Sequence, residues 1–293
     1  MNKLSPLIAA CLAATWFVWG STYLAIKFSL ASFPPFLGMG MRFIAAGLLL
    51  LAWTWHRRRS LPTRVQWRNG IILGSLMLGG NVGGAAYAEQ WVASGLVVSF
   101  IAITPAALAI ASLPFGIRPT RLEIAGIVLG IVGVVLLASG NGFSSSPAGL
   151  IAMVIAVLTW SIGSVLSQHV LPLARGAAGF ATQLLGGGLA LMVASFLARE
   201  TFHWPPQPLA AAAWLYLVVF GSLMAFTAYM VLLSKTSTTL ASSYTFVNPV
   251  IAMLLGVSLG SETVTALEWG AVAIIVAGVT VVVLARDRPA VRS

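Results

Sequence analysis

Long apolar stretches separated by short polar ones organise the whole chain. Ten of these stretches reach the length of about 20 residues that crosses a bilayer as a helix. They cover 7–28, 35–55, 70–89, 93–114, 122–140, 147–168, 177–198, 210–233, 237–260 and 266–285. The runs are continuously apolar and show no two-residue alternation, which favours helices. The pattern predicts an all-α integral membrane protein with ten transmembrane helices.

Basic residues concentrate on one side of these predicted spans. The connections after spans 1, 3, 5, 7 and 9 hold only Arg199 and, at the margin, Lys27. The termini and the other connections hold Lys3, Arg57, Arg58, Arg59, Arg64, Arg68, Arg118, Arg121, Arg175, Lys235, Arg286, Arg288 and Arg292. Positive charge is retained on the cytoplasmic side of a membrane. We therefore expect a multi-pass protein of the bacterial inner membrane with both termini in the cytoplasm.

Short sequence marks repeat in the same order in the two halves of the chain. Gly74-Ser75-Leu76-Met77 returns as Gly221-Ser222-Leu223-Met224, and Leu122-Glu123 returns as Leu267-Glu268. Trp19 and Gly47 align on one offset with Trp160 and Gly188. Five spans is an odd number, so a second copy enters the membrane upside down. The marks predict two inverted-topology five-helix repeats, residues 1–143 and 144–293, an architecture common in secondary carriers.

One repeated segment places a proline inside an apolar span of each half. Ser99-Phe100-Ile101-Ala102-Ile103-Thr104-Pro105 matches Ser243-Tyr244-Thr245-Phe246-Val247-Asn248-Pro249 in its serine, aromatic, polar and proline positions. Proline removes a backbone donor and kinks a helix. The match predicts two broken helices with hinges at Pro105 and Pro249. Because the second copy is more polar, ligand recognition is expected to depend more on Tyr244 and Asn248 than on Phe100 and Thr104.

Polar and aromatic side chains form stripes on several predicted helices. Trp16, Trp19, Tyr23 and Lys27 follow helical spacing on span 1. Stripes from both repeats that converge on one cavity would form the substrate site of a carrier. The predicted substrate-binding residues are Trp19, Tyr23, Asn81, Phe100, Thr104, Trp160, Ser164, Tyr244 and Asn248. The alternative is that the aromatic residues only fill the core or the membrane interfaces.

Three charged residues near the outer side are candidates for coupling. Arg42 lies about 10 Å into span 2 at a rise of 1.5 Å per residue, where an unpaired charge is costly. Glu89 would pair with Arg42 or Lys27 and exchange that partner for a proton or substrate. In the alternative, all three side chains reach the interface by snorkelling. Glu123, Glu262 and Glu268 are expected to cap or flank helix N-termini, where negative charge is favourable.

Composition agrees with a membrane carrier. Of the 293 residues 59% are hydrophobic and 8% charged, with a net charge of +10 and a mean hydropathy of +0.98. The basic residues serve topology, so no nucleic-acid partner is expected. The chain has no Walker A loop, no metal-binding histidine spacing and no nucleophile with a base, so neither a cofactor, a metal nor an enzymatic activity is expected. Gly126 and Gly130 allow close helix packing within a monomer or, alternatively, in a homodimer.

The chain resembles the drug/metabolite transporter superfamily and its EamA branch, with YedA-like inner-membrane exporters as the nearer group. The residues that carry the likeness are Trp19-Gly20-Ser21-Thr22-Tyr23, Pro34-Pro35, Arg42-Phe43, Ala45-Ala46-Gly47, Ala88-Glu89, Ser94-Gly95, Tyr244, Asn248-Pro249, Gly260, Glu262 and Glu268-Trp269. The resemblance implies alternating access through a central cavity built mainly by spans 1, 3, 4, 6, 8 and 9, with spans 5 and 10 at one end.

These patterns predict a secondary active exporter of small metabolites or drugs, including amino acids or related amphipathic solutes. Protons are a candidate coupling ion. An importer or exchanger of the same fold is an alternative, as is a channel-like or scaffold protein. A channel needs a continuous polar pore, whereas the polar residues here cluster near the middle of the spans.

Overall fold

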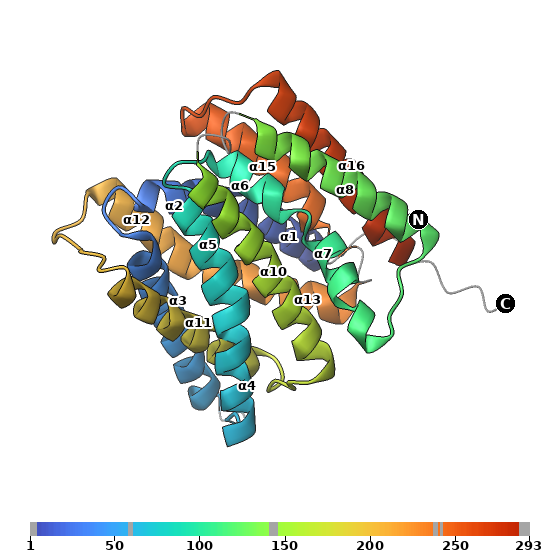
Figure 1. The fold of residues 1–293 in the computed structure, drawn as a ribbon. Coiled ribbons are helices and arrows are strands. Elements are labelled where there is room, and N and C mark those ends of the chain that lie inside the picture. Colours follow the sequence, from blue (N-terminus) through green and yellow to red (C-terminus); the bar gives the residue numbers. More distant parts are fainter. Residues whose placement is uncertain (1–4, 58–60, 141–145, 237–239, 241–242, 287–293) are drawn as a thin grey trace.

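The computed structural model describes residues 5–57, 61–140, 146–236, 240 and 243–286. Within these ranges it is an all-helical bundle without strands (Figure 1). Nine of the helices there are long and apolar enough to span a membrane, and Tyr244–Leu259 is a shorter apolar helix. The all-helical membrane class predicted from the hydrophobic runs is thus confirmed. Lys3, Arg58, Arg59, Arg288 and Arg292, which entered the topology argument, lie outside the described residues.

Each predicted span corresponds to one helix or to consecutive helical pieces. Span 1 comprises α1 (Pro6–Ala13), η1 (Ala14–Val18) and α2 (Trp19–Ser29), and span 2 is α3 (Pro35–His56). Span 3 comprises α4 (Arg64–Gly74), η2 (Ser75–Gly80) and α5 (Asn81–Ala88). Span 4 is α6 (Ser94–Ile101) and α7 (Thr104–Ala111), which the turn η3 (Leu113–Phe115) follows, and span 5 is α8 (Arg121–Ser139).

The second half comprises the other five predicted spans. Span 6 is α10 (Pro147–His169) and span 7 is α11 (Ala177–Leu197). Span 8 comprises α12 (Pro208–Tyr216), η4 (Leu217–Met224) and α13 (Ala225–Lys235). Spans 9 and 10 are α15 (Tyr244–Leu259) and α16 (Ala266–Arg286).

Side-chain caps set the start of several helices. Thr63 and Gln66 form a reciprocal capping box, so α4 begins at Arg64, six residues before the predicted apolar span. Glu123 accepts a hydrogen bond from the Thr120 backbone amide at the start of α8. Glu268 accepts one from the Thr265 amide ahead of α16. The expectation that Glu123 and Glu268 cap helix N-termini is confirmed.

The repeated Gly-Ser-Leu-Met segments share a backbone irregularity. Ser75–Gly80 of span 3 and Leu217–Met224 of span 8 are both π-helical, and each contains the serine of its copy. A π-helical turn adds a residue to the helix and is rare in an otherwise regular span. The two segments of matching sequence therefore also match in local structure.

The two proline segments differ in their local structure. Span 4 is interrupted at Ala102 and Ile103, and Pro105 occupies the first turn of α7. In span 9, α15 runs without interruption from Tyr244 through Pro249 to Leu259. The prediction of two matched breaks is therefore wrong for the described part of span 9: Pro249 lies inside α15, where a proline removes one helical hydrogen bond, and the helix continues on both sides of it. Residues 237–239 and 241–242 of this span lie outside the described residues.

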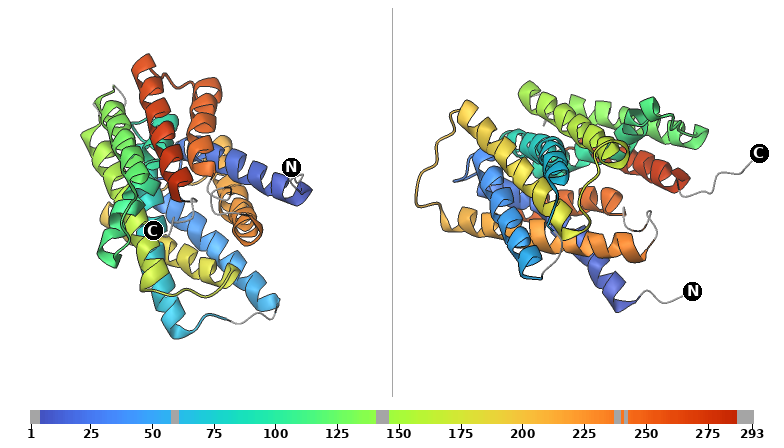
Figure 2. Two further views of the ribbon diagram at one scale, coloured as in Figure 1. Left: turned by 90° about the vertical axis from the view of Figure 1, so that its right-hand side faces the viewer. Right: turned by 90° about the horizontal axis from the view of Figure 1, so that it is seen from below.

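Helix pairs from opposite halves pack against each other throughout the bundle. The pair α8–α16 lies at one end and the pair α3–α11 at the other (Figures 1 and 2). Gly126 and Gly130 of α8 lie against Gly278 of α16, so this glycine pair serves packing within the chain. Several other contacts between spans are also reciprocal, because exchanging each span for the span five places away gives another observed contact. Span 3 contacts spans 6 and 7 as span 8 contacts spans 1 and 2, and span 1 contacts span 9 as span 6 contacts span 4.

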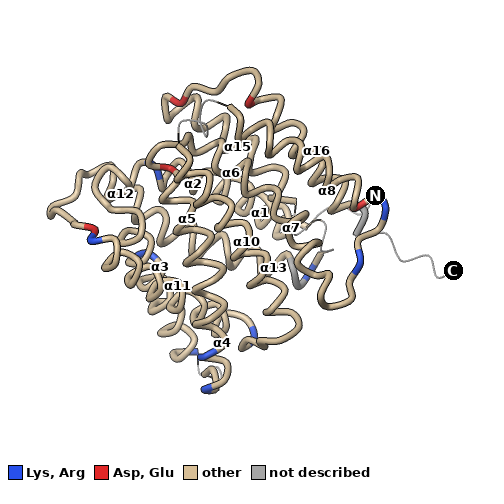
Figure 3. Tube along the Cα trace, in the orientation of Figure 1, with Lys and Arg blue, Asp and Glu red and all other residues tan. Residues whose placement is uncertain are grey.

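Charged residues separate across the bundle. Figure 3 shows the Lys and Arg positions mostly along its lower right side, and the Asp and Glu positions mostly toward the upper left. This separation runs along the helix axes, as the distribution of basic residues in the sequence predicts. Which face is cytoplasmic stays a prediction.

Candidate functional site

The polar stripe of span 1 faces the second half of the chain. The indole Nε1 of Trp16 donates to the Ser243 hydroxyl at 2.8 Å, and that of Trp19 donates to the Gly221 carbonyl at 3.2 Å. Further along, Lys27 pairs with Glu262 at 2.7 Å. Span 1 therefore presents successive polar contacts to spans 8 and 9 and to the segment after span 9, from its middle to its C-terminal end.

Three aromatic rings meet at the centre of this stripe. Trp19 makes an edge contact with Tyr244 at 4.8 Å between ring centroids and a tilted contact with Tyr229 at 5.4 Å. Tyr229 and Tyr244 contact each other edge to face at 5.6 Å. All three rings are half-buried. Trp19 and Tyr244, which were predicted as site residues on separate spans, are thus in direct contact.

Asn248 extends this aromatic cluster by one helical turn. In the amide orientation that satisfies its surroundings, its nitrogen donates to the Trp16 carbonyl at 3.0 Å and to the Tyr244 carbonyl at 3.2 Å. Gly20 lies against Asn248 and Ile251 of α15, which allows the two helices to approach closely. The side chain of Asn248 therefore joins spans 1 and 9 at the cluster.

Arg42 reaches the same place from α3. Its side chain is buried, and its Nε donates to the Ser222 hydroxyl at 3.0 Å. A Cβ on Gly221 would lie 3.0 Å from the Arg42 guanidinium. Gly221 is also the residue whose carbonyl accepts from Trp19. No carboxylate among the described residues forms an ion pair with Arg42, so a buried cation lies without a counter-ion beside the aromatic cluster.

The predicted partners of Glu89 are engaged elsewhere. Lys27 is bound to Glu262, and Arg42 is bound to Ser222. Glu89 is 3% exposed, and neither of its carboxylate oxygens has a hydrogen-bond partner in the described part of the chain. The expected pairing of Glu89 with Arg42 or Lys27 is therefore absent from this conformation. Burial of the Glu89 and Arg42 side chains also argues against snorkelling for both residues.

Glu262 has more contacts than a simple helix-flanking role requires. Besides Lys27, it accepts from the Ser94 amide at 2.8 Å and the Gly95 amide at 3.4 Å. These amides open α6, so Glu262 caps this helix from a distant segment of the chain. The expectation of a helix-terminal role is confirmed, with the addition that the capped helix lies in the other half of the protein.

The remaining predicted residues have mainly local or packing contacts. Asn81 donates to the Ala156 carbonyl of α10 at 3.1 Å. The hydroxyls of Thr104 and Ser164 donate to the carbonyls of Ile101 and Trp160 in their own spans. Phe100 is buried in one hydrophobic core cluster, against which the half-buried Tyr23 also packs, and Trp160 packs on a second core cluster.

Sequence reasoning missed Tyr229, Gly221 and Ser222 as site residues. Gly221 and Ser222 were noticed only as marks of the repeat, because their neighbours could not be read from the chain. Tyr229 lies eight residues after Gly221 on the same span, and a search for aromatic residues beyond that mark would have found it.

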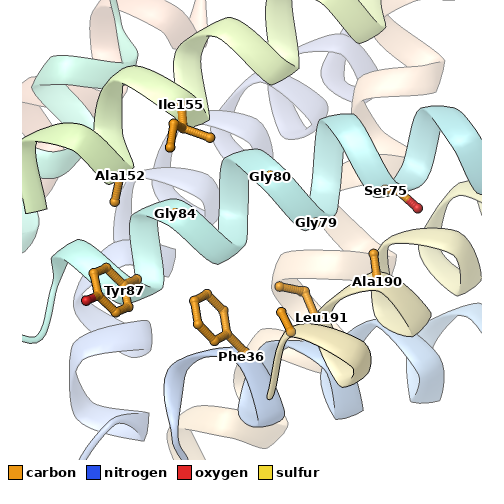
Figure 4. A pocket seen from close by; sticks show the side chains of 11 residues that line it. Phe36, Ser75, Gly79, Gly80, Gly84, Tyr87, Ala152, Ile155, Ala190 and Leu191 are labelled. Atoms are coloured by element: carbon orange, nitrogen blue, oxygen red, sulfur yellow. The ribbon is translucent and has the colours of Figure 1, made fainter. Parts of the chain in front are cut away.

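Neither of two cavities in the described part of the bundle is lined by the three rings of the aromatic cluster. One, of about 350 Å³, lies between α3, α5, α10 and α11 and is almost wholly apolar (Figure 4). Phe36, Tyr87 and Leu191 surround it, and none of the predicted site residues lines it. The other, of about 410 Å³, lies at the C-terminal ends of α2 and α5 and the N-terminal end of α6, and its lining includes Lys27, Glu89 and Glu262.

Comparisons with known proteins agree with this architecture. The model of the EamA-like transporter family matches residues 4–139 and again residues 147–284. The chain belongs to the EamA-like transporter family. It is 39% identical over 286 residues to the uncharacterized inner membrane transporter YedA of Escherichia coli (strain K12), covering 97% of this chain and 93% of YedA.

More distant relatives extend the family likeness. A WAT1-related chloroplastic protein of Arabidopsis thaliana is 30% identical over 269 residues, covering 88% of this chain and 64% of that protein. A solved crystal structure, 22% identical, matches 96% of this chain and 99% of its own with a TM-score of 0.65, which supports the fold. The general role of this EamA family member is that of a multi-pass inner-membrane transporter.

Proposed function

We propose that this chain is a secondary carrier that exports small amphipathic solutes by alternating access, with its binding site at the aromatic cluster and Arg42. The observation that carries the proposal is the meeting of Trp19 and Arg42 at Gly221. A guanidinium without a counter-ion offers donors to an anionic or accepting group of a ligand. Aromatic faces offer apolar surface to the rest of the same ligand.

Amino acids and related amphipathic metabolites combine these two features, and they are the first substrate class to test. Tyr244 and Asn248 would contribute ring surface and an amide, and Ser222 would hold Arg42 in position. Tyr23, Asn81, Phe100, Thr104, Trp160 and Ser164 would line or support the route through the bundle. Pro105 and Pro249 would serve as hinges, of which Pro105 lies directly beside a break in the helix.

The inverted arrangement of residues 1–143 and 144–293 is part of the proposal. The separate matches of the family model to the two halves support it. The reciprocal packing of spans and the shared π-helical segments add further support. In such an architecture the site lies between the repeats, and rocking of one set of helices against the other alternates its access.

A thermal-shift screen of the purified full chain tests the binding site. Amino acids, cationic drugs and sugars would be compared, because a ligand that binds only the folded state raises the apparent melting temperature. We expect an amphipathic solute with an anionic group to stabilise the protein, and Arg42→Gln to abolish that shift. A ligand that stabilises the wild type and Arg42→Gln equally would contradict the assignment of Arg42.

Flux in proteoliposomes then separates the alternatives. Saturation of the initial rate with ligand concentration indicates a carrier, whereas a linear rate indicates a channel. Net efflux against a gradient from vesicles of known orientation distinguishes export from import or exchange. Protons are the proposed coupling ion, with Glu89 as the group that would bind them and Lys27 as a candidate partner in the charge pair.

A further inference from the structure

A polar cavity of about 410 Å³ opens at the outer end of the bundle; we call it the outer vestibule. It is bounded by the ends of α2, α5 and α6 and by the segment 261–268 that precedes and begins α16. Its lining residues are Lys27, Glu89, Gln90, Trp91, Val92, Ala93, Leu96, Ser261, Glu262, Thr263, Thr265 and Glu268. It therefore brings three carboxyl groups and one ammonium group into one space.

Two of these carboxyl groups have donors. Glu262 accepts from Lys27 and from two backbone amides of α6. Glu268 accepts from the amide and the hydroxyl of Thr265 at 2.8 and 2.9 Å. The Glu89 carboxyl group differs because it is buried and both of its oxygens lack a hydrogen-bond partner among the described residues.

The state of Glu89 follows from the cost of burying charge. An ionised carboxylate without donors is far more costly to bury than a neutral carboxyl group. The charges that act on Glu89 are those of Glu262, Lys27 and Arg42, and the Tyr23 hydroxyl also interacts with it. In the conformation described, Lys27 neutralises Glu262, so Glu89 has no ion-pair partner.

Access to the Glu89 carboxyl oxygens limits the size of a cation that could bind them. Both oxygens are closed to solvent although the residue lines the outer vestibule. An organic ammonium ion would need space that the protein does not leave around these atoms. A proton needs none, and the Lys27 ammonium, which lines the same cavity, can approach if it leaves Glu262.

We propose that Glu89 is an exchangeable proton site that controls the outer gate of the carrier, with Glu89 and Glu262 as competing partners of Lys27. In the closed gate Glu89 carries the proton and Lys27 binds Glu262. When the Glu89 O–H bond breaks, its proton passes to water in the vestibule and the carboxylate takes the Lys27 ammonium. Glu262 then keeps the two amide hydrogen bonds of α6 and loses its link to α2. This inference rests on the proposed function, since the gate is that of the proposed carrier.

The consequence for the gate comes from what the Lys27–Glu262 pair joins. Lys27 lies in α2, and Glu262 lies between α15 and α16 and caps α6. The pair thus fastens three parts of the bundle at the outer end. Its release frees α2 from the other two parts, and alternating access needs such a separation on one side at a time.

A cysteine reporter on the vestibule wall tests the switch without any substrate. Cys11, the single cysteine of the chain, is replaced by serine. Leu96→Cys then places a thiol at a vestibule position that is 1% exposed. Labelling of the purified full chain by a water-soluble maleimide is measured at about pH 5 and about pH 8, one value below and one above neutral pH.

We expect the labelling rate to rise when the pH is made alkaline. This rise should be severalfold larger in the protein with Glu89 than in Glu89→Gln. Because the thiol itself ionises more at high pH, the same reporter in Glu89→Gln supplies the correction. Glu268→Gln is the matched control, since Glu268 lines the same cavity but has its own donors, and it should keep the full response. Identical pH profiles with Glu89 and Glu89→Gln would overturn the proposal.

Lys27→Met provides a second test if Glu89→Gln does not fold. It removes the ammonium that fastens the gate, so labelling should be fast at both pH values. Slow, pH-dependent labelling in Lys27→Met would overturn the role of the ion pair. Protection of the reporter by methylammonium that requires Glu89 would assign the site to an organic cation and would also overturn the proton proposal.

The result separates the gate from the carrier. A Glu89-dependent labelling response without saturable flux supports the switch and contradicts the transport proposal. Saturable flux together with a labelling response that is the same with Glu89 and in Glu89→Gln contradicts the switch and leaves the transport proposal intact.

Discussion

The two Gly-Ser-Leu-Met segments have the same residues, and both overlap a π-helical stretch, but they have different neighbours. Gly74 packs against the backbone of Gln183 in α11, and the Ser75 hydroxyl donates to carbonyls of Ile71 and Gly186. Gly221 instead touches the guanidinium of Arg42 in α3 and accepts from Trp19. The first segment thus serves packing, whereas the second holds polar and aromatic side chains.

The comparison is closer than the four shared residues suggest. The offset that aligns Trp19 with Trp160 also aligns Arg42 with Gln183. The glycine of each segment lies against the aligned position of the opposite half, Gly74 against Gln183 and Gly221 against Arg42. The two halves therefore share this contact, and a single change of side chain places a charge in only one of them.

The largest expected effect distinguishes the two glycines. A Cβ at Gly74 would lie 2.0 Å from the Gln183 carbonyl oxygen, which is backbone and cannot move aside. Gly74→Ala should therefore destabilise the protein by ~3 kcal/mol or more. At Gly221 the Cβ would meet side-chain atoms of Thr22 and Arg42 at 2.9 and 3.0 Å, so Gly221→Ala should fold and lose transport. Melting temperature and flux are measured for both variants. Equal destabilisation of Gly74→Ala and Gly221→Ala would contradict the difference between the two segments.

Arg42→Gln makes the two halves chemically alike at this position. We expect ligand binding and transport to fall by about tenfold or more, because each hydrogen bond to a charged group contributes ~1.5–3 kcal/mol. Arg42→Lys should recover little, since an ammonium cannot reproduce the guanidinium geometry. Gln183→Ala is the control on the first segment and should leave the dissociation constant near the wild-type value. A larger loss in Gln183→Ala than in Arg42→Gln would reverse the assignment.

The aromatic and amide positions of span 9 should matter more than their counterparts in span 4. Asn248 bridges spans 1 and 9, whereas the Thr104 hydroxyl bonds only within span 4. Asn248→Ala should reduce transport severalfold and Thr104→Ala by less than about twofold, given ~1 kcal/mol for a neutral hydrogen bond. Tyr244→Ala against Phe100→Ala extends the test, with flux corrected for the amount of folded protein. Equal losses of transport within each pair would contradict the expected asymmetry between spans 9 and 4 but would be compatible with the proposed repeat.

The smallest expected effect concerns the two serines. Ser222→Ala removes the acceptor of the Arg42 Nε, so transport should fall about two- to fivefold while the fold persists. Ser75→Ala removes hydroxyl bonds to carbonyls alone and should leave transport unchanged. Initial rates at saturating and limiting ligand would separate a binding defect from a slower cycle. A Ser75→Ala protein as impaired as Ser222→Ala would show that the π-helical segments, not their neighbours, set the effect.

Much of the membrane architecture was determined by the sequence itself. Continuous apolar runs of bilayer length form helices, because lipid offers the backbone no hydrogen-bond partners and a helix satisfies its own. That constraint is local, so the nine spanning helices and the shorter helix Tyr244–Leu259 of the described residues could be read from the chain. A threonine three residues before a glutamate or glutamine lies at three of the helix starts. The family likeness was also readable, since its marks are spread over nearly the whole sequence.

Only the tertiary structure decided which of the predicted site residues meet. Trp19 and Tyr244 are 225 positions apart, and their contact depends on how spans 1 and 9 pack. Arg42 could have paired with Glu89 by charge alone, yet packing brings it to Gly221 and Ser222, while Lys27 pairs with Glu262. Both charged side chains are long and flexible, so their partners follow from distances between helices that no local pattern encodes. For the same reason the sequence marked Glu89 as a charge in a span, and only the fold showed that it is buried with no hydrogen-bond partner in the part of the chain that the structure describes.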